Sequence, residues 1–200
     1  RQAGGVPVDL GIAADTPESI AHHLEPAADC DLLITSAGVS VGEHDHLRGV
    51  IEAAGGGIDF WRVRMRPGAP VAFGGFGRIP WIGLPGNPVS TMVTFELFVR
   101  AAIRRMMGHR APFRRAVSVV AGEPIRLGPR LQHFLRAVVT GEPGQMAARL
   151  TGPQGSGILT SMMAANALLV VPEDQQEVAA GQTLSALVLD DPGFAEEPGF

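Results

Sequence analysis

The stretch LITSAGVSVGEHDH, residues 33–46, decides the fold of this chain because it joins a predicted strand to a loop of small residues. The overlapping run DLLIT, 31–35, is nearly all apolar, as is typical of a strand covered on both faces of its sheet. Small residues directly after such a strand let the backbone approach a ligand closely. We therefore expect a buried strand that ends at a binding loop.

Outward from this stretch, strands and helices are predicted to alternate up to about residue 110. Such alternation is typical of a three-layer α/β domain with a mostly parallel sheet. The longest predicted helix lies within 84–108, where Asn87 is the expected N-cap, Pro88 the first helical residue and Gly108 the stop. The other predicted helices begin after Thr16 and near Leu47, and the predicted strands cover residues 6–12, 31–35, 58–65, 70–76 and 78–84.

The sequence changes character near residue 111. Short apolar segments broken by Gly and Pro follow, and this spacing predicts a small β barrel or sandwich. We expect an α/β domain over 1–110, a β domain over 111–190, and a disordered tail over 191–200, which is acidic and rich in Pro and Gly. Because the chain opens on Arg1 in the middle of an element, we expect it to be the C-terminal part of a longer protein.

Composition narrows the classes of function. The formal net charge is −4, which makes no electrostatic case for nucleic acid or a membrane surface. The apolar runs are shorter than the roughly 20 residues of a membrane-spanning helix. A single cysteine, Cys30, cannot form an internal disulfide and favours a cytoplasmic location.

The loop after residue 35 is the first candidate site. Its consecutive amides, made accessible by Gly38 and Gly42, form a hollow suited to a phosphate, and hydroxyl donors come from Thr35, Ser36 and Ser40. An ordinary tight turn explains the glycines equally well. Beside the hollow, Asp45, with Glu43 second, is the expected ligand of Mg²⁺, whereas His44 and His46 are expected in a solvated loop.

Two further stretches follow predicted strands in the same domain. RMRPGAP, 64–70, places Arg64 and Arg66 beside a Pro-Gly turn, where a guanidinium can meet an oxyanion, although a plain hairpin fits too. LPGNPVS, 84–90, is a stiff loop at a helix start, with or without a ligand. Because ligands bind outside the carboxyl ends of strands in such sheets, the three stretches together predict one crevice for a phosphorylated small molecule.

These residues are where a family resemblance enters. TSAGVSVGEHD, RPGAP followed by AFG, and GLPGNPVS, in that order, resemble the molybdopterin molybdenumtransferases, the group of MoeA and the gephyrin E domain. FLRA at 134–137, PQGSGILTSMMAAN at 153–166 and LLVVPED resemble that family's C-terminal β domain.

The resemblance implies a fold of the molybdenum cofactor biosynthesis type. It also implies insertion of molybdate into adenylated molybdopterin, with release of AMP and a requirement for Mg²⁺. An elongated homodimer is implied as well, and a molybdopterin adenylyltransferase is a candidate partner. Asp45 and Arg66 are the implied catalytic residues, with Asp45 and Glu43 holding the metal. The implied substrate-binding residues are Thr35, Ser36, Gly38, Ser40, Gly42, Pro67, Gly68, Pro85, Gly86, Asn87, Pro88 and Ser90.

Two positions depart from the family pattern. Ala37 replaces a usual glycine, which is a modest change where the backbone has a negative φ. Ala69 replaces a usual lysine and removes positive charge from an oxyanion pocket. The alternatives are therefore a pterin-binding scaffold with impaired catalysis or, less in keeping with the β domain, an adenylyltransferase. Either molybdate or tungstate fits the resemblance as the inserted oxyanion.

Overall fold

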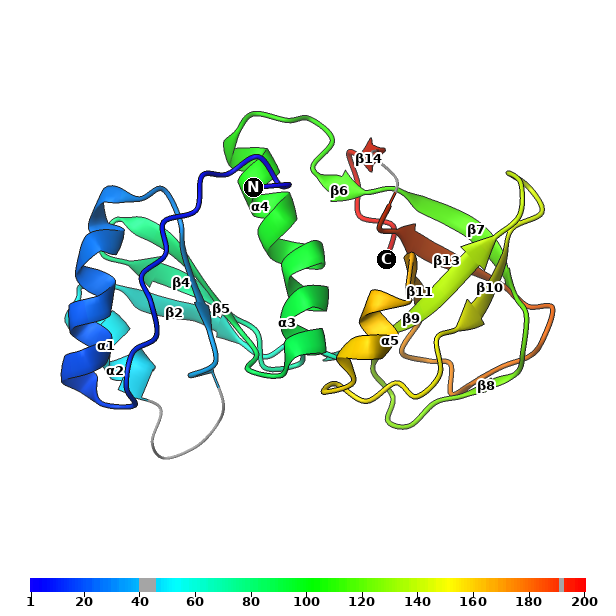
Figure 1. The fold of residues 1–200 in the computed structure, drawn as a ribbon, viewed down its shortest axis with the longest axis horizontal. Coiled ribbons are helices and arrows are strands. Elements are labelled where there is room, and N and C mark those ends of the chain that lie inside the picture. Colours follow the sequence, from blue (N-terminus) through cyan, green and yellow to red (C-terminus); the bar gives the residue numbers. More distant parts are fainter. Residues whose placement is uncertain (40–45, 191–192) are drawn as a thin grey trace.

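The structure is a computed structural model that describes residues 1–39, 46–190 and 193–200. An α/β unit and a β barrel lie on either side of one long helix (Figure 1). The α/β sheet has the strand order β1-β5-β4-β2. Its strands are β1 (Leu33–Ser36), β2 (Gly57–Trp61), β4 (Ala72–Phe76) and β5 (Ile79–Leu84).

Helices cover both faces of this sheet, as the predicted three layers require. On one face lie α1 (Pro17–Leu24), a 3₁₀ turn η1 (Glu25–Asp29) and α2 (His46–Ala53). They share a core with the strands that includes Leu24, Ile51 and the fully buried Trp81. On the other face the long helix packs Val99 against Val71 and Ile82.

The sheet is mixed, so the prediction of a mostly parallel sheet was wrong for the described strands. Only the β1–β5 pair is parallel, whereas β4 pairs antiparallel with both β5 and β2. The reason is local: β4 and β5 are joined by a tight turn at Gly77, whose φ is +57°, and such a connection can only produce antiparallel strands.

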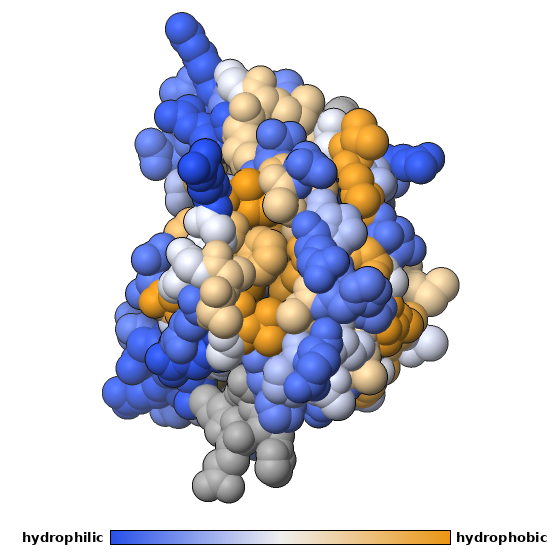
Figure 2. Space-filling model, turned by 90° about the vertical axis from the view of Figure 1, so that its left-hand side faces the viewer, coloured by the Kyte–Doolittle hydropathy of each residue, from blue (hydrophilic) through white to orange (hydrophobic). Residues whose placement is uncertain are grey.

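Residues 6–12 are not a strand, contrary to prediction. They run as an extended segment from beside α4 to α1, drawn in dark blue in Figure 1, and no strand pairing involves them. Val6 and Ile12 are more than nine-tenths exposed. Apolar and hydrophilic surface are interspersed on this end of the molecule (Figure 2).

The long helix consists of three consecutive pieces, α3 (Pro88–Thr94), a π-helical segment η2 (Phe95–Val99) and α4 (Arg100–Met106). Pro88 is its first residue and Gly108, at φ +83°, follows its end, as predicted. The π segment was not predicted, since hydrophobic spacing alone does not reveal a local change of helical pitch.

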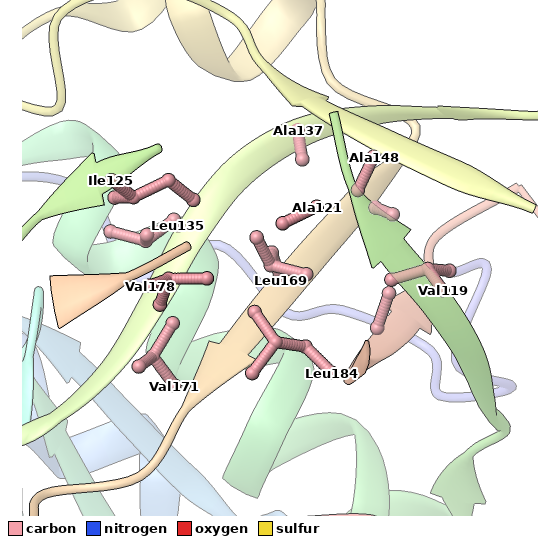
Figure 3. Close-up of a cluster of buried hydrophobic side chains, with 12 residues drawn as sticks. Val119, Ala121, Ile125, Leu135, Ala137, Ala148, Leu169, Val171, Val178 and Leu184 are labelled. Carbon is pink, nitrogen blue, oxygen red and sulfur yellow. The ribbon is translucent and has the colours of Figure 1, made fainter. Parts of the chain in front are cut away.

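The C-terminal unit is a closed barrel, which decides between the predicted barrel and sandwich. The ring runs β10-β7-β13-β11-β9 and closes through β10–β9 pairing. Its interior is filled by small and branched side chains such as Val119, Leu135 and Leu169 (Figure 3). The barrel strands are β7 (Ala116–Ala121), β9 (Gln132–Thr140), β10 (Ala147–Leu150), β11 (Ala167–Val171) and β13 (Thr183–Val188), accompanied by β6 (Phe113–Arg114), β8 (Ile125–Arg126), β12 (Glu177–Val178), β14 (Phe194–Ala195) and α5 (Leu159–Met163).

The two units share a seam. Strand β3 (Met65–Arg66) leaves the α/β unit and pairs in parallel with β9 of the barrel sheet. Beside it, Val89, Val93 and Leu97 of the long helix join Phe134 and Leu168 of the barrel in one buried cluster. The predicted strand at 58–65 is therefore two strands, β2 and β3, each serving a different sheet.

Residues 193–200 pack on the molecule, in contrast to the predicted disorder of 191–200. Strand β14 pairs antiparallel with β6, and the ring of Phe200 meets Phe134 edge-on at 5.3 Å between centroids. Composition alone missed this segment because two phenylalanines anchor an otherwise polar stretch.

Candidate functional site

A cavity of about 440 Å³ lies at the junction of the two units. The three stretches singled out in the sequence converge on it, each after the end of a strand, and a loop of the β barrel forms a further wall. The described lining residues are Ala37, Gly38, Val39, Arg66, Pro67, Gly68, Ala69, Pro70, Pro85, Gly86, Asn87, Ser90, Gln154 and Ser156.

The loop after β1 meets the cavity through its backbone. Ala37 and Gly38 both have left-handed φ values, +70° and +71°, and the Ala37 amide donates to the carbonyl of Leu84 at 3.0 Å. The turn presses against the proline loop, since a Cβ on Gly86 would lie 3.3 Å from the Cβ of Ala37. The replacement of glycine by Ala37 would be a modest change only at a negative φ, and that condition is not met.

Thr35 and Ser36 lie behind the cavity and do not line it. The Thr35 hydroxyl accepts a hydrogen bond from Trp81 Nε1 at 3.0 Å, and the Ser36 hydroxyl donates to the Pro85 carbonyl at 3.3 Å. Both hydroxyls thus hold neighbouring segments together. Ser40, Gly42, Glu43 and Asp45, together with His44, lie outside the described residues, so their predicted roles stay predictions.

The turn after β3 brings Arg66, Pro67, Gly68 and Ala69 to the cavity wall. Gly68 has φ +102°, and a side chain there would collide with Thr94 of the long helix, so the site requires glycine. Arg66 is exposed, and it is the only charged side chain among the described lining residues.

Arg64, two residues before Arg66, faces away from the cavity. Its Nε donates to Glu173 of the barrel at 3.0 Å, in an ion pair that solvent reaches. Of the two guanidinium groups considered in the sequence, only that of Arg66 belongs to the site.

The proline loop after β5 provides Pro85, Gly86 and Asn87, and Ser90 lines the cavity from the first turn of α3, whereas Pro88 begins that helix and does not line the cavity. Asn87 has the extended backbone of an N-cap, yet its side chain makes no capping hydrogen bond. Its Nδ2 donates instead to Ser156 Oγ of the barrel at 3.1 Å, and the Ser156 carbonyl accepts from the Val89 amide at 3.2 Å. The barrel loop therefore satisfies the helix start.

Gln154 and Ser156 are site residues that the sequence analysis did not assign. They belong to the glycine-rich loop GPQGSG, 152–157, which overlaps the stretch 153–166 that entered the sequence analysis only through its family resemblance. The loop is held from behind by Arg136, which is fully buried. Its glycine content was the available signal, but nothing local indicates which cavity such a loop reaches.

Arg136 shapes this loop through its whole guanidinium group. Nη1 donates to the Gln154 carbonyl at 3.1 Å, and Nη2 donates to the carbonyls of Pro153 and Gly155 at 3.2 and 2.9 Å. Nε donates to Ser161 Oγ at 3.0 Å. Burial lowers the pKa of Arg136 from its ordinary value. Because hydrogen bonds from a charged group are among the stronger ones in proteins, the three contacts with loop carbonyls fix the conformation of the loop.

The described lining of the cavity contains one cation and no carboxylate. Nor do three His, Cys, Asp or Glu side chains gather as a metal site anywhere in the described ranges. The described part of the cavity thus fits an anion.

Fold and site together define a two-part protein whose cavity, between an α/β unit and a β barrel, is suited to a small anionic molecule. The family described as "Probable molybdopterin binding domain" matches residues 1–105, and "MoeA C-terminal region (domain IV)" matches residues 118–189. The chain belongs to the MoeA family of molybdopterin-binding proteins.

Similar proteins with assigned names support the same family. A protein named molybdopterin molybdenumtransferase 2, from Mycobacterium tuberculosis strain H37Rv, is 37% identical over 92% of this chain and 46% of its own length. A molybdopterin molybdenumtransferase from Haemophilus influenzae is 33% identical over 89% of this chain and 45% of its own length. The chain therefore spans somewhat less than half the length of these curated relatives.

A solved structure supports the same assignment. The molybdenum cofactor biosynthesis protein from Pyrococcus furiosus superposes with a TM-score of 0.70 at 25% identity, covering 92% of this chain and 59% of the other. In the part of the chain that the structure describes, none of the helices is both long and apolar enough to span a membrane.

Proposed function

We propose that this chain contributes the molybdopterin-binding part of a molybdopterin molybdenumtransferase, which inserts molybdate into adenylated molybdopterin and releases AMP. The observation that supports the proposal is the convergence of the three loop stretches and the barrel loop on one cavity, where Arg66 is the single cation among the described lining residues. The names of the relatives supply the transfer of molybdenum to molybdopterin, whereas the adenylated substrate and the release of AMP are implied by the family resemblance.

Each wall has a role in this proposal. The backbone of Ala37 and Gly38 admits the phosphate region of the substrate, because small residues permit close approach. Arg66 pairs with an oxyanion, either phosphate or molybdate, through its planar fork of donors. Gln154 and Ser156 supply neutral hydrogen-bonding groups from the barrel side.

Mg²⁺ is part of the proposal through Glu43 and Asp45, whose carboxylates are ligands of the kind it prefers. When bound it would neutralise charge on substrate phosphate. Asp45 and Arg66 are the proposed catalytic residues. The proposal also includes a cytoplasmic location, a homodimer, and a molybdopterin adenylyltransferase that supplies the substrate.

Paired arginine substitutions test the binding site. Arg66→Ala should weaken binding of adenylated molybdopterin roughly 10- to 100-fold, because a hydrogen bond to a charged group contributes about 1.5–3 kcal/mol. Arg64→Ala is the matched control, since its side chain pairs with Glu173 outside the cavity. Isothermal titration calorimetry measures both, and equal losses in the two variants would contradict the proposed site.

Ala69 favours a second function, a scaffold that binds the pterin without turnover, because no ammonium stands at that wall. AMP release with Mg²⁺, measured with and without molybdate, separates the two functions. Release that depends on molybdate supports the transferase. Binding without release, restored by Ala69→Lys, supports the scaffold, and ATP-dependent adenylation of molybdopterin would instead indicate an adenylyltransferase.

A further inference from the structure

The end of the long helix is rich in arginine. Six arginines lie between residues 100 and 115, and Glu96 is the only acidic residue from 96 to 115. The Glu96 carboxylate accepts from Arg100 at 2.7 Å through both Nε and Nη2, and from Arg114 Nε at 3.0 Å. These two guanidinium groups, from α4 and β6, therefore converge on one partly buried acid of the long helix.

Arg104 belongs to the same group. Its Nη2 donates to the Ala111 carbonyl at 3.2 Å, while its Nε is buried without a hydrogen-bond partner. Burial, together with the charges of Arg100 and Arg114, lowers the pKa of Arg104 from its ordinary value. Several positive charges thus lie close together at this surface. They repel one another, so an aromatic ring or an anion beside them is stabilising.

That neighbour is a segment of the chain itself. The guanidinium carbon of Arg104 lies 3.4 Å from the ring centroid of Phe194, and that of Arg114 lies 5.4 Å from the same centroid. One aromatic ring is therefore contacted by two cations. The backbone of Phe194 also takes part, because β14 pairs with β6 and the register places Phe194 opposite Arg114.

The segment then crosses from the helix to the barrel. Gly199 packs so closely on Ala116 that a Cβ there would collide with it, and Phe200 contacts Phe134. Phe134 is part of the buried cluster between the two units. Glu196 and Glu197 are exposed, and the segment 193–200 contains no basic residue, so its side chains carry only negative charge.

We propose that the α4–β6 surface is a docking site for an extended acidic segment bearing a phenylalanine, and that residues 193–200 occupy it. Three kinds of recognition combine there: pairing along a strand edge, a ring held by two guanidinium groups, and complementary charge. The occupied site fastens the long helix to the barrel.

The docking surface is separate from the cavity. Ser90 lines the cavity and Arg104 holds Phe194 fourteen residues further along the same helix, which corresponds to about 21 Å at 1.5 Å per residue. Ligand affinity at the cavity is therefore expected to be unchanged when the segment is released, so failure of one proposal does not affect the other.

Hydrogen exchange in the full chain tests the docking. Phe194→Ala should accelerate exchange of the β6 amides at least tenfold, whereas Phe60→Ala, which removes a half-exposed ring from β2, should not. A double variant, E196Q/E197Q, keeps the packing and should accelerate the same amides at low salt, with the difference lost at high salt. Unchanged β6 exchange in both docking variants would overturn the proposal.

A peptide probe tests the specificity. A labelled peptide with the sequence of residues 190–200 should bind the Phe194→Ala chain, more weakly as salt rises, and the same peptide with alanine in place of phenylalanine should not. Equal binding of the two peptides, or binding that salt does not change, would overturn the assignment of the surface.

Discussion

At the scale of single residues, Ala37 occupies a conformation that favours glycine. Its φ of +70° places it in the left-handed region, which costs an alanine about 1–2 kcal/mol. Ala37→Gly removes this strain but adds freedom to the unfolded chain, so we expect a net gain in unfolding free energy of about 0.5–1 kcal/mol. Urea denaturation measures the change.

The matched control for this variant is Ala21→Gly in the middle of α1. There the backbone is helical and the same substitution should lower stability by about 1 kcal/mol. Opposite signs in the two variants are expected. A loss of stability in Ala37→Gly would mean that the alanine makes contacts worth more than its strain.

Gly68 is constrained both by its backbone conformation and by the space around it, and two substitutions can separate these effects. Gly68→Ala should cost about 2–4 kcal/mol, of which about 1–2 reflects φ +102° and the rest the collision with Thr94. Gly108→Ala, at φ +83° with open space around it, measures the conformational part alone. Thermal unfolding of both variants gives the difference.

Thr94→Ser removes the methyl group in the path of the new side chain and retains the hydroxyl, which donates to the Ser90 carbonyl. Adding it to Gly68→Ala should restore about half of the lost stability. If the double variant is no more stable than Gly68→Ala, the contact with Thr94 does not explain the requirement for glycine.

At the scale of elements, the barrel loop 152–157 depends on a residue that does not line the cavity. Arg136→Lys replaces a fork of donors by one ammonium, which cannot reach all four oxygens that Arg136 contacts. We expect a loss of about 2–4 kcal/mol, faster hydrogen exchange in 152–157 and weaker ligand binding. Arg149→Lys, exposed on β10, should stay within about 0.5 kcal/mol.

The same substitution distinguishes two roles for Arg136. A residue that only stabilises the barrel would lower the unfolding midpoint and leave the dissociation constant of the folded protein unchanged. A residue that positions Gln154 and Ser156 should change both quantities. An unchanged dissociation constant would therefore contradict the positioning role.

Helices and strands were predictable from the sequence where the local pattern of residues also suits the contacts made in the folded protein. Thr16 caps α1 as its sequence predicts, accepting from the Ser19 amide, and Gly108 follows the long helix. Residues 6–12 have the apolar alternation of a strand but no pairing partner, and pairing is a tertiary property. Asn87 shows the same limit, because its cap position is local while its side-chain partner Ser156 is distant in sequence.

The three loop stretches of the candidate site were recognisable because each follows a strand predicted in the same α/β domain, although β3, before the second stretch, pairs in the barrel sheet. The fourth wall was not, since Gln154 and Ser156 reach the cavity only through the seam between two units. Arg66 and Arg64 looked equivalent in the sequence and differ in the structure, because only Arg64 meets Glu173. Such contacts depend on how the barrel is docked.

At the scale of the whole molecule, the shared seam predicts that the two units unfold together. Strand β3 pairs with β9, and Val93 and Leu97 pack with Leu168 of β11. Both tryptophans, Trp61 and Trp81, lie in the α/β unit, so their fluorescence reports that unit alone. Its midpoint should coincide with that of far-UV circular dichroism.

Two neighbouring leucines of β11 sharpen this prediction, because both are fully buried but face different cores. Leu168 faces the seam, whereas Leu169 faces the barrel interior. Each change to alanine should cost about 2–5 kcal/mol, and in a coupled molecule both shift the tryptophan midpoint. If Leu169→Ala moves only the circular dichroism signal, the barrel unfolds independently, and the cavity at the junction would then lose its barrel wall before the α/β unit melts.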